Sequence, residues 1–477
     1  MLQGVCKAIK CAIMAKKTPK DPLIVVLGAT GTGKSQLAVD LARRFNGEII
    51  NGDAMQMYDG LPIITNKMTR EEQQGIPHHL LGFIALDEEP WRVGLFKQKA
   101  GQIIKEIRSR GRLPILVGGT HYYTQSLLFD ETLDQTSPPE EDQIQYGYSN
   151  KEMVEKFPIL EGPTEEMLSR LREVDPVMAD RWHPKDRRKI RRSLEIFLVS
   201  GKKASDIYAE QMAVKAATKL SNTAKESTVP PLVDSGSMLL FWVYAESEIL
   251  KKRLDARIDK MLGSGLLDEV KSMESFLQKQ AISGIEIDRT RGIWVSIGYK
   301  EFEPYLKMLN SVTASASEVQ KSYELSVEQT KSATRQYAKQ QVRWIRLKLI
   351  PALAEVDAQD RLYLMDGSDV SRFSETVSQP AIEISKSFLE ADERIPPFEV
   401  CAAAAQILNP DDSVEPKDTN FRQECELCHT VVVTDAQWQI HLKSRRHRAL
   451  VKKKQKNERS GRFRPPPSGS ISESDTP

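Results

Sequence analysis

The chain has 477 residues, of which 40% are hydrophobic and 28% charged, and its formal net charge is only +2. This length accommodates two or three domains, and the composition is that of an ordinary globular protein. The balanced charge argues against a uniformly basic nucleic-acid binder. No apolar run approaches the roughly 18 residues that a membrane-spanning helix needs, so we expect no membrane association.

Residues 1–20 are predicted to be a flexible N-terminal segment. They contain five lysines and no acidic residue, and a second methionine stands at position 14. This composition is a weak mitochondrial targeting signal, and alternative starts would supply two compartments. We therefore expect the protein in the cytoplasm and in the mitochondrion.

The first predicted strand, residues 23–27, runs directly into a glycine-rich turn, and a predicted helix over 35–42 follows. The glycines let backbone N–H groups approach an oxyanion, and the helix N-terminus adds partial positive charge. Lys34 can neutralise phosphate and Ser35 can hold a magnesium ion. The sequence therefore predicts a phosphate-binding loop made of Gly28, Ala29, Thr30, Gly31, Thr32, Gly33, Lys34 and Ser35.

Phosphoryl transfer is the default expectation for such a loop, but its usual acidic partner is missing. The apolar run 113–117 leads into Gly118, Gly119 and Thr120, and the run 239–243 ends without a well-placed acid. Instead, Asp53 follows the short predicted strand 48–50. Ligands of a parallel sheet bind at the carboxyl ends of its strands, so Asp53 should face the loop. An acid in that place can act as a base rather than as a metal ligand.

Strand and helix patterns alternate over residues 21–130, which predicts an α/β fold, a doubly wound parallel sheet of the P-loop NTPase-like kind. Helical periodicity then dominates, and a Ser/Thr/Lys-rich stretch follows before the chain returns to the core. The predicted organisation is a catalytic core over 21–130 and 238–350, a helical RNA-binding insertion over 131–212, a flexible loop over 213–237 and a linker over 351–420.

Positive charge is concentrated in two segments. Residues 181–192 hold seven Lys or Arg against one acid, and residues 443–464 hold eleven against one. A polyanion can lie along such segments, although a solvated helix face is the ordinary alternative for the first. The lysine-rich run 452–456 also resembles a nuclear address, so the nucleus is a further compartment to consider.

The five cysteines are an odd number scattered over a long chain, which argues against a disulfide framework. Cys425 and Cys428 are separated by two residues, twelve residues follow, and His441 and His447 are separated by five. This is the spacing of a tetrahedral zinc site with two cysteines and two histidines. We predict a structural Zn²⁺ finger over 421–450, which adds RNA affinity, and a basic and then disordered tail over 451–477.

Motifs along residues 21–350 occur in the order expected of the tRNA dimethylallyltransferases, and the finger resembles the eukaryotic branch of that family. The phosphate-binding loop and Asp53 are the first two of these motifs. The remaining motifs are residues 64–67 (ITNK), 77–80 (PHHL), 117–120 (VGGT), 186–195 (DRRKIRRSLE), 253–261 (RLDARIDKM), 297–301 (IGYKE) and 334–339 (TRQYAK).

The resemblance implies transfer of the dimethylallyl group from dimethylallyl diphosphate to N6 of the adenosine 3′-adjacent to the anticodon (position 37) of tRNA. It implies that Lys34, Thr30 and Arg257 hold the diphosphate, that Ser35 helps to place Mg²⁺, and that Asp53 is the general base. The expected partners are the tRNA anticodon stem-loop and dimethylallyl diphosphate, with a monomeric enzyme. The candidate tRNA-binding residues are Gln56, Arg187, Arg188, Arg191, Arg335 and Lys339.

Two positions depart from the pattern of the family. Val295 stands where glutamine is frequent, and Gln340 stands where arginine is frequent. The first bears on packing near the site and the second on affinity for RNA. Neither departure touches the loop or Asp53, so activity remains the expectation.

Three alternatives stay open at the level of sequence. The chain could prenylate free adenine nucleotides, as an adenylate isopentenyltransferase of cytokinin synthesis does, or it could be a P-loop nucleotide kinase. It could also be a zinc-finger RNA-binding protein with an inactive core. The insertion and the finger argue against a small acceptor, and the intact loop with Asp53 argues against an inactive core.

Overall fold

The computed structural model describes residues 18–129, 150–210, 235–408, 423–428, 430–432 and 435–459. The chain forms two compact units, the first made of residues 1–132 and 226–414 and the second of residues 133–225 and 415–477. Most of the predicted flexible N-terminal segment, most of the predicted loop 213–237 and the tail after residue 459 lie outside the described residues.

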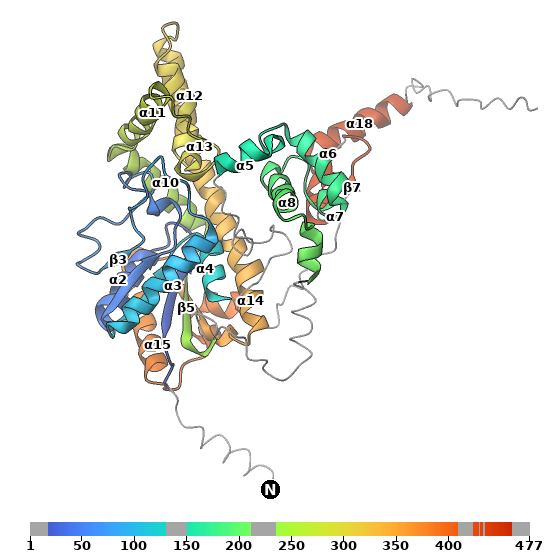
Figure 1. Ribbon diagram of the computed structural model, residues 1–477. Helices are drawn as coiled ribbons and strands as arrows, with labels where there is room; N and C mark the ends of the chain where they lie inside the picture. Colours follow the sequence, from blue (N-terminus) through green and yellow to red (C-terminus); the bar gives the residue numbers. More distant parts are fainter. Residues whose placement is uncertain are drawn as a thin grey trace, which may run out of the picture. The chain divides into compact units, whose positions relative to one another are not determined.

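The first unit is built on a six-stranded sheet in which every pair of neighbouring strands is parallel (Figure 1). The strand order is β3-β2-β4-β1-β5-β6. Parallel neighbours require crossover connections, so the sheet confirms the predicted doubly wound α/β fold. The strands are β1 (Leu23–Gly28), β2 (Gly47–Asn51), β3 (His78–His79), β4 (Leu113–Val117), β5 (Met238–Tyr244) and β6 (Leu362–Asp366).

Helices cover both faces of this sheet, as the side chains of β1 show. Leu23, Val25 and Leu27 pack in one core cluster with residues of α3 (Val93–Ser109) and α4 (His121–Leu128). Ile24 and Val26 point to the other face, into a cluster with residues of α2 (Lys34–Phe45) and α15 (Gln379–Leu389). Strands buried on both faces are apolar throughout, which explains the uninterrupted hydrophobic run of β1.

Five further α-helices of this unit lie between β5 and β6 in the sequence. They are α10 (Ser247–Gly263), α11 (Leu266–Ile282), α12 (Tyr299–Leu309), α13 (Ala316–Trp344) and α14 (Ile350–Glu355). Ser315 caps α13, because its hydroxyl accepts the Glu318 N–H and the Glu318 carboxylate accepts the Ser315 N–H in return. Helices α11, α12 and the first half of α13 extend away from the sheet (Figure 1).

The prediction that residues 351–420 form a linker is wrong for the part described, which ends at residue 408. β6 adds the last strand to the sheet, in register from Leu240 opposite Leu362 to Tyr244 opposite Asp366. Residues of α15 and of α16 (Ala402–Ile407) enter the two core clusters. A five-residue strand between polar segments has too little periodicity to be recognised, and its partner strand lies over a hundred residues upstream.

The second unit contains the helices predicted for the insertion and the finger. Helices α5 (Asn150–Lys156), α6 (Thr164–Val174), α7 (Pro176–Arg181) and α8 (Arg187–Ser200) surround a core that includes Leu171, Trp182 and Leu194. The finger comprises β7 (Gln423–Glu424), β8 (Val431–Val432), α17 (Asp435–Leu442) and α18 (Arg445–Arg459). The basic stretch 451–459, predicted as a tail, is therefore helical. Within the described residues, no helix is long and apolar enough to cross a bilayer.

Replacing Leu364 tests whether β6 belongs to the core. Leu364 is fully buried, so Leu364→Ala should lower the free energy of unfolding by about 2–5 kcal/mol, measured by denaturant titration. Val370, which is 63% exposed just after β6, supplies the control, and Val370→Ala should change stability by about 0.5 kcal/mol or less. If Leu364→Ala changed stability as little as Val370→Ala does, β6 would not be part of the core.

Candidate functional site

The phosphate-binding loop connects β1 to α2, as predicted, and the backbone of Gly33 shows why the loop needs glycine. Gly33 has a φ of 97°, in the left-handed region that disfavours other residues. A Cβ at Gly33 would also lie 2.5 Å from the ring of Phe373, which follows β6. Both the backbone conformation of the loop and the nearby ring of Phe373 therefore require glycine at position 33.

Lys34 lies at the start of α2, and its ammonium group donates to Ala29 O at 2.8 Å. Burial lowers the pKa of Lys34 to about 8, opposed by attraction to Asp53 and assisted by repulsion from Arg257. A partly desolvated ammonium is a strong site for an anion, since an anionic oxygen would stabilise its charged form.

Two arginines one helical turn apart on α10 have different tasks. The Arg257 guanidinium donates to the Thr30 hydroxyl at 2.9 Å, and its Nε is buried with no partner in the described part of the chain. Arg253 instead donates to backbone carbonyls, at 3.2 Å to Gly31 O and at 2.9 Å to Ser368 O. Arg257 therefore points its charge at the loop, whereas Arg253 ties the loop to the segment after β6.

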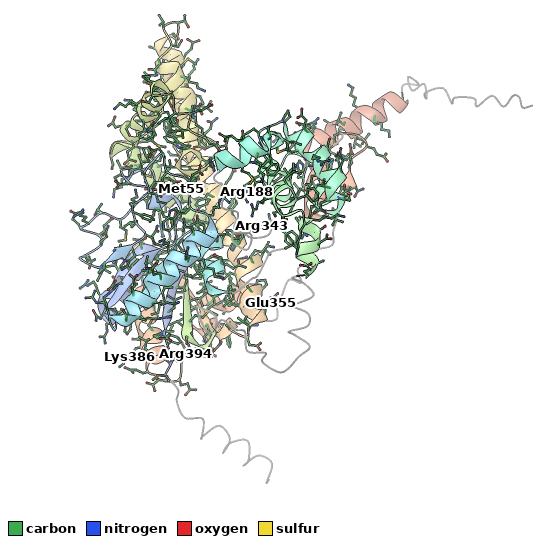
Figure 2. The ribbon with its side chains drawn as sticks, viewed as in Figure 1. Met55, Arg188, Arg343, Glu355, Lys386 and Arg394 are labelled. Carbon is green, nitrogen blue, oxygen red and sulfur yellow. The ribbon has the colours of Figure 1, made fainter. Side chains whose placement is uncertain are left out.

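Asp53 follows β2 and lies close to Lys34 of the loop, as predicted from the sequence. Its carboxylate accepts the N–H of Met55 at 3.1 Å (Met55 is labelled in Figure 2), and the N–H groups of Gln56 and Gly119 also bond to it. Burial raises the pKa of Asp53, while the charge of Lys34 and these N–H donors act in the opposite direction. Asp53 is thus a desolvated carboxylate beside two cations, Lys34 and Arg257.

The turn after β4 closes the site at this edge of the sheet. A Cβ on Gly118 would lie 2.3 Å from the backbone of Gly52, so only glycine allows the two turns to touch. The Thr120 hydroxyl accepts the Ala54 N–H at 3.1 Å, which fixes the backbone beside Asp53. The turns after β1, β2 and β4 therefore form one continuous rim.

Helix α13 supplies two site residues that the sequence reasoning missed. The buried Gln341 side chain accepts the Thr30 N–H at 2.8 Å and donates to Gly119 O at 2.8 Å, so it joins the loop to the turn after β4. Tyr337 bonds to Thr120 and Gln341, and burial followed by repulsion from Asp53 raises its phenol pKa. The spacing of these two residues, one helical turn, was the available signal.

The predicted tRNA-binding residues of the first unit divide into engaged and exposed side chains. Gln56 donates its amide to Thr65 O and Asn66 O, which leaves only its carbonyl oxygen to read a base edge. Arg335 pairs with Asp255 of α10 at 2.5 Å, so it braces α13 against α10. Lys339 is exposed, as is the neighbouring Gln340.

The predicted tRNA-binding residues of the second unit divide in the same way. Arg187 donates to Gly162 O at 2.6 Å and to Leu160 O at 3.3 Å, so it holds the turn before α6. Arg191 pairs with Glu195 at 3.1 Å. Arg188 is exposed on α8 and is labelled in Figure 2.

Magnesium fits the donor set of the loop. Ser35 lies in the first turn of α2, which carries no acidic residue. Mg²⁺ typically takes one or two protein ligands and completes its shell with phosphate oxygens and water. The Ser35 hydroxyl is therefore a suitable protein ligand, with the phosphates of a bound ligand supplying the rest.

The predicted zinc ligands come together in the finger. The ligand atoms of Cys425, Cys428, His441 and His447 all lie within 4.8 Å of one another. Cys428 Sγ is 3.1 Å from His441 Nε2, and Cys425 Sγ is 3.4 Å from His447 Nδ1. A tetrahedral Zn²⁺ with bonds of about 2.3 Å to sulfur and about 2.0 Å to nitrogen implies similar separations. The cluster fits Zn²⁺ and confirms the prediction of a finger.

Fold and site together define a P-loop α/β protein whose loop faces a carboxylate and which carries a Cys2His2 zinc finger. The family model described as IPP transferase matches residues 56–348, and that of a C2H2-type zinc finger matches residues 424–447. The chain belongs to the IPP transferase family.

Similar proteins support this membership. The chain is 38% identical to the tRNA dimethylallyltransferase of Schizosaccharomyces pombe over 93% of this chain and 98% of that one. It is 34% identical to the tRNA dimethylallyltransferase of Homo sapiens, over 91% and 87%. A solved eukaryotic dimethylallyltransferase acting on tRNA matches with a TM-score of 0.69 and 32% identity, over 92% of this chain and 98% of that one.

Gln341 offers a test of the rim. Gln341→Met keeps the volume of the side chain but leaves the Thr30 N–H and Gly119 O unpaired, which should cost about 1–3 kcal/mol of stability. It should also weaken the binding of inorganic diphosphate, measured by calorimetry. The exposed neighbour supplies the control, and Gln340→Met should alter neither quantity. A stable, tightly binding Gln341→Met variant would show that the bridge does not hold the loop.

Elemental analysis of the purified chain should find one zinc per chain, since the finger supplies one complete ligand set. Cys428→Ser should abolish the bound zinc. Cys401→Ser should retain it, because Cys401 lies in the first unit, where its sulfur accepts the Ala404 N–H. Zinc that persists in Cys428→Ser would contradict the assigned ligands.

Proposed function

We propose that this chain is a tRNA dimethylallyltransferase that moves the dimethylallyl group of dimethylallyl diphosphate to N6 of the adenosine 3′-adjacent to the anticodon. The products are N6-isopentenyladenosine and diphosphate. The observation that carries the proposal is the meeting of the Asp53 carboxylate with Lys34 and Arg257 in one phosphate-binding rim. Lys34 and Arg257 can bind an anionic leaving group, and the Asp53 carboxylate can accept a proton.

The charges of the rim match the charges that develop in the reaction. The allylic C–O bond breaks with its electron pair moving to the diphosphate, where Lys34, Arg257 and the loop N–H groups stabilise the negative charge. The amine N6 supplies the electron pair of the new C–N bond, and its proton passes to the Asp53 carboxylate. Atoms and charges balance with no further reactant.

Asp53 suits the role of base because of its surroundings. Burial raises the pKa of Asp53, which makes the carboxylate a stronger proton acceptor, and Lys34 favours its ionised form. Mg²⁺, held by Ser35 and the diphosphate, would add Lewis-acid stabilisation of the leaving group.

A tRNA acceptor accounts for parts of the chain that a mononucleotide would not use. The target adenosine must leave its stack before N6 can reach the allylic carbon, so the anticodon loop has to be splayed. We propose that the exposed Lys339, Arg188 and the basic helix α18 contribute phosphate contacts. The Cys428→Ser variant should then bind tRNA more weakly, with less salt dependence, yet turn over normally at saturating tRNA.

We further propose that the enzyme is monomeric and works in the cytoplasm and the mitochondrion, with the nucleus as a further compartment. The lysine-rich residues 1–20 with Met14, and the run 452–456, support these compartments. Cell fractionation after replacement of Met14 is the test, because unchanged mitochondrial protein would reject a role for that start.

Asp53→Asn should lower turnover by roughly 100- to 10,000-fold, because the amide cannot accept the proton. Affinity for tRNA, measured by filter binding, should stay within about twofold of the parent. Asp59 is exposed and is not one of the rim residues. Asp59→Asn should therefore retain full activity, and it is the control. Near-normal turnover of Asp53→Asn would reject the base assignment.

One assay separates the proposed reaction from its alternatives. The purified chain is incubated with labelled dimethylallyl diphosphate and either tRNA or AMP, and in parallel with labelled ATP. Label on tRNA alone supports the proposal, and label on AMP supports an adenylate isopentenyltransferase. Transfer of the terminal phosphate of ATP supports a kinase, and tight RNA binding without any transfer supports an inactive core.

A further inference from the structure

We propose that His121 is a further substrate-contacting residue, whose imidazole donates a hydrogen bond to an oxygen of the diphosphate. The inference rests on the proposed function, because it takes the rim to be a diphosphate site. The surroundings of His121 in the structure assign it this task.

His121 is buried but has no hydrogen-bond partner. Only 5% of the residue is exposed, and neither Nδ1 nor Nε2 bonds to any group in the described part of the chain. Buried polar groups nearly always have partners, so such an exception indicates a missing ligand or water. In His121, both polar atoms of the side chain lack a partner in the described part of the chain.

The other described histidines set the comparison. Each of them has a ring nitrogen in contact with a partner: His78 with Ile76 O, His79 with Glu48, His183 with the Lys185 N–H, and His441 and His447 with the finger cysteines. Lack of a partner is therefore not a general property of histidines in this chain. It is confined, among the described histidines, to the one that lies at the rim.

The position of His121 places it beside the phosphate-binding loop. It is the first residue of α4 and directly follows the turn after β4, the strand that pairs with β1. One turn further along α4, Gln125 accepts the indole N–H of Trp344, so this face of α4 meets the end of α13. Gln341, one turn before Trp344 on α13, bonds to the loop itself. His121 thus lies where loop, turn and α13 converge.

The neighbouring charge identifies an anion as the occupant. Burial, with repulsion from Lys34, lowers the pKa of His121 to about 3, so the ring is neutral and carries one N–H donor. Lys34 is therefore close enough for its charge to act on the ring. A diphosphate oxygen drawn to Lys34 would meet this donor, and accepting a hydrogen bond there would give the orphaned ring its partner.

The test measures inorganic diphosphate binding by calorimetry, in Mg²⁺-containing buffer, for the parent chain and three variants. His121→Phe keeps the shape of the ring without a donor, and affinity should fall about 10- to 100-fold, as for a lost hydrogen bond to a charged group. His121→Gln, which restores an N–H donor, should recover part of that affinity. The control is Tyr123→Phe, which removes a bond to Trp91 O from the same helix and should bind within about twofold of the parent.

Nitrogen-15 resonances of the histidine rings give a second readout, because the response to diphosphate is measured on the parent chain itself. The ring signal that is missing from both His121→Phe and His121→Gln identifies His121, and in the parent it should shift when diphosphate is added. A signal that stays in place, or a His121→Phe affinity equal to that of the parent, overturns the proposal and points to a buried water. A parent chain that binds no diphosphate would instead refute the proposed function.

Discussion

The mutual stabilisation of buried opposite charges is the constraint on which the site depends. Lys34, Arg257 and Asp53 are each drawn toward their neutral forms by burial, and each is held toward its charged form by the others of opposite sign. Removing one member would leave the remaining charges desolvated and poorly compensated. The proposed reaction, which separates charge, would therefore use charges that the fold already holds together.

That arrangement exists because three strand ends meet at one edge of the sheet. The turns after β1, β2 and β4 lie side by side, since β4 pairs with both β1 and β2. Gly118 lets two of the turns touch, and Gln341 of α13 joins the third to them. A helix more than two hundred residues away in sequence thus sets the position of the phosphate-binding loop.

The C-terminal part of the first unit has a role that reaches beyond closing the sheet. Phe373 packs against Gly33, and Arg253 joins Gly31 O to the carbonyls of Gly367 and Ser368. The loop is therefore supported by a segment that lies outside the matched range 56–348 of the family model. In this chain, the segment that follows the last strand of the sheet also supports the phosphate-binding loop.

Local pattern alone predicted where the glycine-rich loop, Asp53 and the zinc ligands lie, because each depends on short spacings whose chemistry follows from neighbouring residues. The linker prediction for 351–420 was wrong, and Gln341 and Tyr337 were missed, because β6 and α13 acquire their meaning from partners far away in sequence. The sequence also could not tell which basic side chains are available to RNA. Arg187 binds backbone carbonyls and Arg335 binds a carboxylate, whereas Arg188 is exposed. A sequence reveals which groups can react, but folding decides which of them meet, since long-range packing determines what each side chain faces.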